Sequence, residues 1–85
     1  MSEAPHNKEL HQELIGLSNR MLRLISPEAT HQHYKGGLYK VTCVHENGMT
    51  YYTHCFPHEA GLYERDTEEF SEEVLPGVRR FRPLF

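Results

Sequence analysis

The chain has 85 residues and a formal net charge of −3, and 38% of its residues are hydrophobic. This length allows one domain with a thin core, which buries only about 60–65% of the surface of the unfolded chain. A membrane span needs roughly 18 consecutive apolar residues, and the sequence has no such run. Because phosphate binding depends on lysine and arginine, the net negative charge also argues against generic binding to duplex DNA.

The beginning of the chain is polar and acidic, without the basic start and apolar run of an export signal. The two cysteines, Cys43 and Cys55, are too few for a disulfide framework, so both are predicted to be free thiols. These features predict a soluble cytoplasmic protein.

The N-terminal third has one strong periodic pattern. Residues 1–7 lack periodicity and are predicted to be disordered, whereas apolar residues then recur at helical spacing. The members of this stripe are Leu10, Leu14, Leu17, Met21 and Leu24. They predict an amphipathic helix over residues 8–26, which Pro27 ends. Two alternatives are open: the helix packs on its own domain, or it pairs with other copies in a homo-oligomer.

The next segments read as strands joined by turns. Residues 27–36 form a polar connector, and residues 38–44 and 49–56 are rich in β-branched and aromatic residues. Asn47-Gly48 between them predicts a hairpin with a type I′ turn. Residues 62–65 are a third short strand.

The C-terminal part continues this pattern. Asp66 or Thr67 caps one helical turn, Pro76-Gly77 is a turn, and residues 78–84 are a last strand that Pro83 confines to an edge. Turn signals this dense predict an α+β fold, an N-terminal helix followed by a small antiparallel SH3-like β-barrel over residues 33–85.

Several motifs add a family resemblance. They are Tyr34-Lys35-Gly36-Gly37-Leu38-Tyr39, Thr50-Tyr51-Tyr52, Gly61-Leu62-Tyr63-Glu64-Arg65 and Arg80-Phe81. Across residues 33–84 the chain resembles the bacterial and phage family catalogued as domain of unknown function number 1653. The resemblance implies a small SH3-like barrel and no particular activity. Because the family domain stands without a long N-terminal helix, we expect the helix to govern oligomerisation.

Aromatic and basic residues favour a non-enzymatic binding module that captures a nucleotide-like, phosphate-bearing ligand or a short nucleic acid. Tyrosine rings offer stacking planes, and lysine and arginine offer partners for phosphate. The candidate ligand-binding residues are Tyr34, Lys35, Tyr39, Tyr52, Tyr63, Arg65, Arg80 and Arg82. In a phage, such a module would serve to sequester a host nucleotide signal. No cofactor is expected.

Two other functions are open. The first is a protein–protein adaptor that uses the helical stripe and the acidic segment 64–73. The second is a hydrolase or metal site around His54, Cys55 and His58. Zinc takes four N or S ligands, but the adjacent residues His54 and Cys55 should point to opposite faces of their strand. No catalytic or metal-binding residue is therefore assigned.

Overall fold

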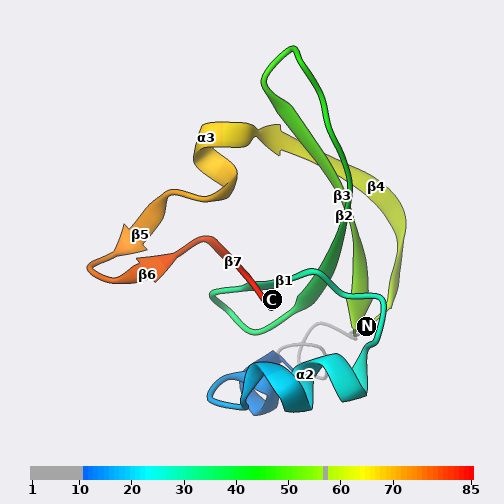
Figure 1. The fold of residues 1–85 in the computed structure, drawn as a ribbon, viewed down its shortest axis with the longest axis vertical. Coiled ribbons are helices and arrows are strands. Elements are labelled where there is room, and N and C mark those ends of the chain that lie inside the picture. The colour runs from blue at the N-terminus through cyan, green and yellow to red at the C-terminus, as the bar shows by residue number, and fades with distance from the viewer. Residues whose placement is uncertain (1–10, 57) are drawn as a thin grey trace, which may run out of the picture.

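The computed structural model describes residues 11–56 and 58–85, which form an antiparallel sheet with a few short helices (Figure 1). Residues 11–14 are helical. The elements that follow are α2 (Asn19–Ile25), β1 (His31–His33), β2 (Leu38–Val44), β3 (Met49–Phe56), β4 (Glu59–Asp66), α3 (Thr67–Phe70), β5 (Glu73–Leu75), β6 (Val78–Arg79) and β7 (Phe81–Pro83). Within the described residues, no helix is long and apolar enough to cross a membrane.

The main sheet has five strands in the order β4-β3-β2-β1-β7, and each neighbouring pair is antiparallel. A separate two-stranded sheet joins β5 to β6. The outer strands β4 and β7 do not pair with each other, and α3 and the β5–β6 hairpin lie between them along the chain (Figure 1). The sheet is therefore not closed, and the predicted SH3-like β-barrel is not confirmed. The mixture of short helices with an antiparallel sheet agrees with the predicted α+β class.

The helix predicted over residues 8–26 is interrupted. The helical turn at 11–14 ends in a turn at residues 15–16, where Gly16 has a φ of +92°. A new helix, α2, then begins behind Ser18, whose side chain accepts a hydrogen bond from the Met21 amide. The left-handed glycine and the serine cap override the apolar periodicity. Residues 1–10, which include Leu10 and the predicted disordered tail, lie outside the described part.

The break divides the predicted apolar stripe. Leu14 is buried and Leu17 packs against the same core, but Met21 is 47% exposed and Leu24 is 69% exposed. Leu22, which was not placed in the stripe, is fully buried. The prediction of one continuous apolar face is therefore wrong for residues 11–26.

The β2–β3 hairpin has the predicted strand bounds, but its turn differs from the predicted type. A type I′ turn needs positive φ at both central residues, and only glycines have positive φ among the described residues. The Gly48 amide donates to the His45 carbonyl at 3.0 Å, and the His45 amide donates to the Met49 carbonyl at 2.8 Å. Gly48 alone is left-handed, with a φ of +89°, so the turn is a three-residue loop closed by glycine.

The remaining elements refine the predicted ones. β1 lies inside the predicted polar connector, and β4 extends beyond the predicted strand 62–65. Asp66 caps α3 by accepting a hydrogen bond from the Glu68 amide, as predicted. The predicted strand 78–84 is divided at Arg80 into β6 and β7, and β7 is an edge strand that ends at Pro83.

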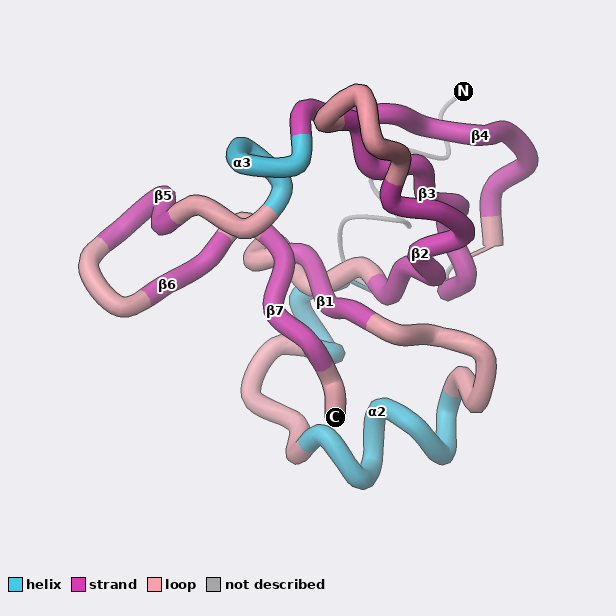
Figure 2. The backbone as a smooth tube through the Cα atoms, turned by 45° about the horizontal axis from the view of Figure 1, so that its top comes forward, coloured by secondary structure: helices cyan, strands magenta, loops and turns pink. Residues whose placement is uncertain are grey.

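Two apolar cores lie on opposite faces of the sheet, because successive residues of a strand point to opposite sides. Leu38 belongs to the first core and Tyr39, the next residue of β2, packs against the second. The first core comprises Leu14, Leu22, Ala29, Leu38 and Leu84. The second comprises Tyr52, Phe70 and Phe81. Figure 2 shows α2 beside the end of β7, where Arg23 donates a hydrogen bond to the Leu84 carbonyl.

Candidate functional site

A cavity of about 340 Å³ lies where segments far apart in the sequence meet. Binding sites for small ligands commonly measure about 300–1,000 Å³, so this cavity is at the lower end of that range. Its lining includes Ile15 and Gly16 from the helix break, Gln32, His33 and Tyr34 from β1 and the following loop, Arg79 from β6 and Arg82 from β7. Among the residues that the structure describes, two arginines and no carboxylate line the cavity.

Arg82 is fixed by neutral partners. One of its terminal nitrogens donates to the Asn19 side-chain oxygen at 2.5 Å, and the other donates to the Gln32 side-chain oxygen at 2.6 Å. No carboxylate of the described residues forms an ion pair with Arg82 or with Arg79. A guanidinium has five N–H donors, so Arg82 is oriented while its positive charge is not neutralised.

Gln32 organises this side of the molecule. Its side chain is buried, and its amide nitrogen donates to the Leu14 and Gly36 carbonyls, each at 3.1 Å. Because its oxygen accepts from Arg82, Gln32 connects the helix break, the loop after β1 and the cavity. Gln32, Asn19 and Arg79 were not predicted as site residues. Arg79 belongs to a cluster of three arginines within residues 79–82, whereas no sequence pattern marks Gln32 and Asn19, since their roles depend on contacts between distant segments.

His33 is neutral at pH 7. Its pKa is lowered to about 4. Burial is the largest cause, and the positive charges of Lys35, Arg65, Arg80 and His11 add to it. Its Nδ1 accepts a hydrogen bond from the Lys35 amide at 3.1 Å, which leaves the proton on Nε2. His33, a residue of the cavity lining, therefore carries an N–H donor and no charge.

The structure separates the predicted ligand-binding residues into groups. Tyr34 and Arg82 line the cavity, and the Lys35 ammonium lies 5.8 Å from the centre of the Tyr34 ring. Tyr39 and Tyr52 instead pack in the second core, where burial raises the pKa of Tyr39 to about 12. These two tyrosines serve the fold and do not line the cavity.

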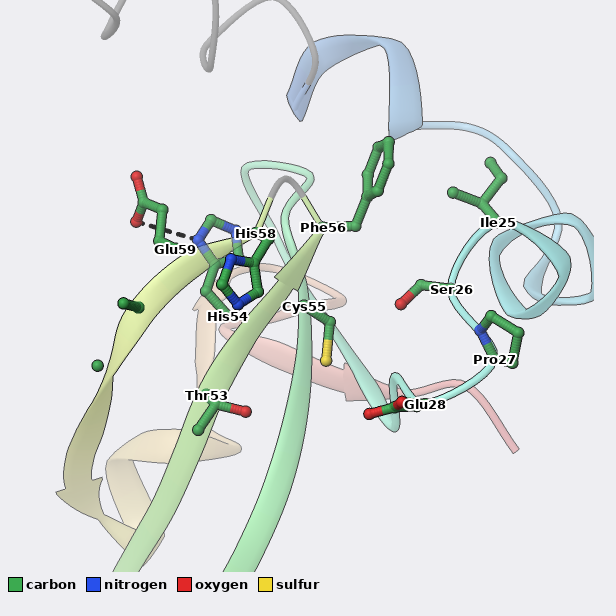
Figure 3. A pocket seen from close by; sticks show the side chains of 12 residues that line it. Ile25, Ser26, Pro27, Glu28, Thr53, His54, Cys55, Phe56, His58 and Glu59 are labelled. Atoms are coloured by element: carbon green, nitrogen blue, oxygen red, sulfur yellow. Dashed lines mark hydrogen bonds and ion pairs between the residues drawn. The ribbon is translucent and has the colours of Figure 1, made fainter.

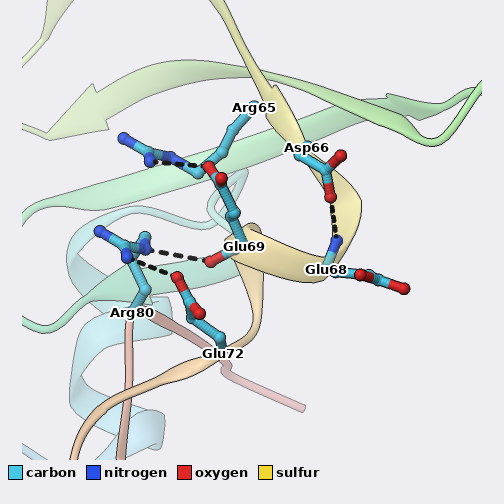
Figure 4. A network of polar contacts seen from close by, with 6 residues as sticks. All are labelled: Arg65, Asp66, Glu68, Glu69, Glu72 and Arg80. Atoms are coloured by element: carbon cyan, nitrogen blue, oxygen red, sulfur yellow. Dashed lines mark hydrogen bonds and ion pairs between the residues drawn. The ribbon is translucent and has the colours of Figure 1, made fainter.

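Of the other three predicted residues, Arg65 and Arg80 contact Glu69 of α3, and Tyr63 lies on β4. Arg80 donates to the Glu69 carbonyl at 3.0 Å and to the Glu72 carboxylate at 2.7 Å, and Arg65 lies 3.7 Å from the Glu69 carboxylate (Figure 4). Tyr63 is 38% exposed, and its ring stacks on that of Tyr52 with the centres 5.7 Å apart. Ion pairs with acids thus occupy part of both arginines.

A second cavity, of about 480 Å³, lies between the end of α2 and strands β3 and β4 (Figure 3). Cys55 faces Ser26 and Glu28 on this side, and burial together with the Glu28 charge raises the pKa of its thiol. A raised pKa disfavours the thiolate that a nucleophile needs.

His54 points to the other face of β3, as the alternation of the strand requires. Its ring stacks on Tyr39 with the centres 4.4 Å apart, and its Nδ1 lies 3.1 Å from a Glu59 carboxylate oxygen. His58 is exposed. His54, Cys55 and His58 all belong to the lining of the 480 Å³ cavity, but the His54 and Cys55 side chains point away from each other. In the described part of the chain, no group of three or more His, Cys, Asp or Glu side chains is arranged to hold a metal ion.

No family model matches this chain, and no curated protein and no solved structure matches it. The resemblance of residues 33–84 to a known family therefore stays a prediction.

Proposed function

We propose that the protein is a non-enzymatic binding module that captures a phosphate-bearing, nucleotide-like ligand in the 340 Å³ cavity. One observation carries this proposal: Arg79, Arg82 and Tyr34 line the cavity, and no carboxylate of residues 11–56 and 58–85 does. Phosphate oxygens accept charge-assisted hydrogen bonds from guanidinium groups, and a base or ribose can pack on the tyrosine ring.

The arrangement of Arg82 supports an anionic ligand over a neutral one. A half-buried guanidinium is usually paired with a carboxylate, because leaving its charge uncompensated is costly. Arg82 is instead held by two neutral amides, so a bound phosphate would supply the missing negative charge. Neutral His33 can donate a further hydrogen bond without changing the charge of the cavity.

Calorimetric titration with AMP, ATP, cyclic AMP and a cyclic dinucleotide tests this function. We expect Arg79→Gln to weaken binding about tenfold or more, the usual effect of removing a hydrogen bond from a charged group. Arg79 is exposed and its one side-chain hydrogen bond goes to the Ser71 carbonyl, so the variant should fold. Tyr34→Ala should also weaken binding.

The matched control is Arg20→Gln, which removes an exposed arginine that does not line the cavity. It should bind each ligand as the parent protein does. Equal affinity of the Arg79→Gln and parent proteins for every ligand of the panel would contradict the proposal, as would equal weakening by both arginine substitutions.

A further inference from the structure

Arg65 and Arg80 form a second pair of cations beside the cavity. Arg65 lies 3.7 Å from the Glu69 carboxylate, and Arg80 donates to the Glu69 carbonyl at 3.0 Å and to the Glu72 carboxylate at 2.7 Å. Figure 4 shows their guanidinium groups extending to the same side of α3. One comes from edge strand β4 and the other from the bend that precedes edge strand β7. The pair therefore lies where the sheet is open.

Arg65 has unused hydrogen-bonding capacity. Its Nε is buried and has no partner among the described residues. Its contact with Glu69, at 3.7 Å, is longer than the roughly 2.7–3.2 Å of a hydrogen bond. Buried donors in native proteins are almost always satisfied, so this one indicates a missing acceptor. The Arg65 side chain as a whole is 34% exposed, so an anion can approach it from solvent.

The backbone of Arg80 contacts the lining of the cavity. The Arg80 carbonyl accepts a hydrogen bond from the Tyr34 amide at 2.9 Å, and Tyr34 lines the cavity. The next residue, Lys35, is exposed and has no carboxylate within ion-pair distance among the described residues. The positive charges of Lys35, Arg65 and Arg80 all help to lower the pKa of His33.

Tyr63 supplies an aromatic plane next to this pair. It lies two residues before Arg65 on β4, so both side chains point to the same face of the strand. Its ring is partly exposed and is supported from beneath by Tyr52. Bases of single strands stack on such rings without regard to sequence.

We infer that the ligand is a single-stranded nucleic acid whose backbone continues from the cavity past Lys35 to Arg65 and Arg80, with one base stacked on Tyr63. This inference rests on the proposed function and adds to it the length and class of the ligand. A mononucleotide would fill only the cavity, whereas a strand of several nucleotides would contact both pairs of arginines.

Calorimetric titration with dTMP and with thymidine strands of two, four and eight nucleotides tests this inference. We expect the eight-nucleotide strand to bind at least tenfold more tightly than dTMP. Tyr63→Ala should weaken binding of that strand roughly 5- to 150-fold, the usual range for a lost stacking platform, without changing the affinity for dTMP. Tyr63→Phe keeps the ring and should bind as the parent protein does.

Arg65→Gln should also act on the long strand alone. Each phosphate contact to a single strand contributes about −0.7 to the slope of log K against log salt concentration, so this variant should have a slope shallower by about 0.7. Arg20→Gln again serves as the control. Affinity that does not rise with length, or an Arg65→Gln variant that weakens dTMP and the long strand equally, overturns the inference. In either case, binding of dTMP that depends on Arg79 would leave the proposed function standing.

Discussion

At the scale of single residues, His33 makes stability depend on pH. Its pKa is about 4 in the folded protein and about 6.5 in the unfolded chain, so between these values only the unfolded chain takes up a proton. The stability from neutral His33 is fully present above pH 6.5 and is lost as the pH falls to about 4. His33→Gln should flatten the fall in the urea midpoint over this window, whereas His45→Gln, on the exposed β2–β3 turn, should not. Identical pH profiles of parent and His33→Gln would contradict this account.

Gly36 is a second residue on which the stability of the fold depends. Its φ is +117°, and a Cβ at this position would overlap the backbone carbonyl of His11. Gly36→Ala should therefore lower the free energy of unfolding by more than the roughly 1–3 kcal/mol of a strained φ alone. Gly48→Ala is the matched control, because Gly48 also has a positive φ but a Cβ there meets nothing within 4 Å. Chemical denaturation of both variants measures the difference, and equal losses would show that the close approach to His11 is unimportant.

At the scale of elements, strands could be predicted more accurately than the N-terminal helix. Buried and half-buried residues alternate along β3, and Leu38, Tyr39 and Val41 of β2 belong to or pack against the two cores, so local preference and tertiary packing agree there. In the helix they conflict. The apolar stripe through Leu17 and Met21 predicts one continuous helix. Gly16 and the capping Ser18 instead break the helix, and the break allows Leu14 and Leu22 to pack in one core.

The same reasoning explains what could be predicted of the candidate site. Tyr34 and Arg82 could be chosen from residue type alone, because the chemistry of phosphate binding favours them. The buried role of Gln32 could not be predicted, since it depends on Leu14, Gly36 and Arg82 meeting in space. The ring of Tyr52 made it a predicted ligand-binding residue. In the structure this ring is buried in the second core and packs against other core residues.

At the scale of the whole molecule, one sheet joins two cores, so loss of either core should unfold both in one cooperative transition. Leu14→Ala removes a buried side chain of the first core and should lower the free energy of unfolding by about 2–5 kcal/mol. Met21 and Leu24 are exposed on α2, so Met21→Glu and Leu24→Glu should change the stability of a monomer by less than about 0.5 kcal/mol.

These variants also separate the two roles first predicted for the apolar stripe. If α2 pairs with another copy through Met21 and Leu24, the glutamate substitutions should halve the mass measured by sedimentation while each chain stays folded. If the stripe serves only its own domain, the mass should not change, and only Leu14→Ala should affect the protein. Leu14 is buried and Met21 is exposed. Leu14→Ala therefore tests the core of one chain, whereas Met21→Glu tests the exposed side of α2, and the two give different results in unfolding and in sedimentation. Unfolding of the Met21→Glu variant at low protein concentration would contradict the exposed position of this side chain.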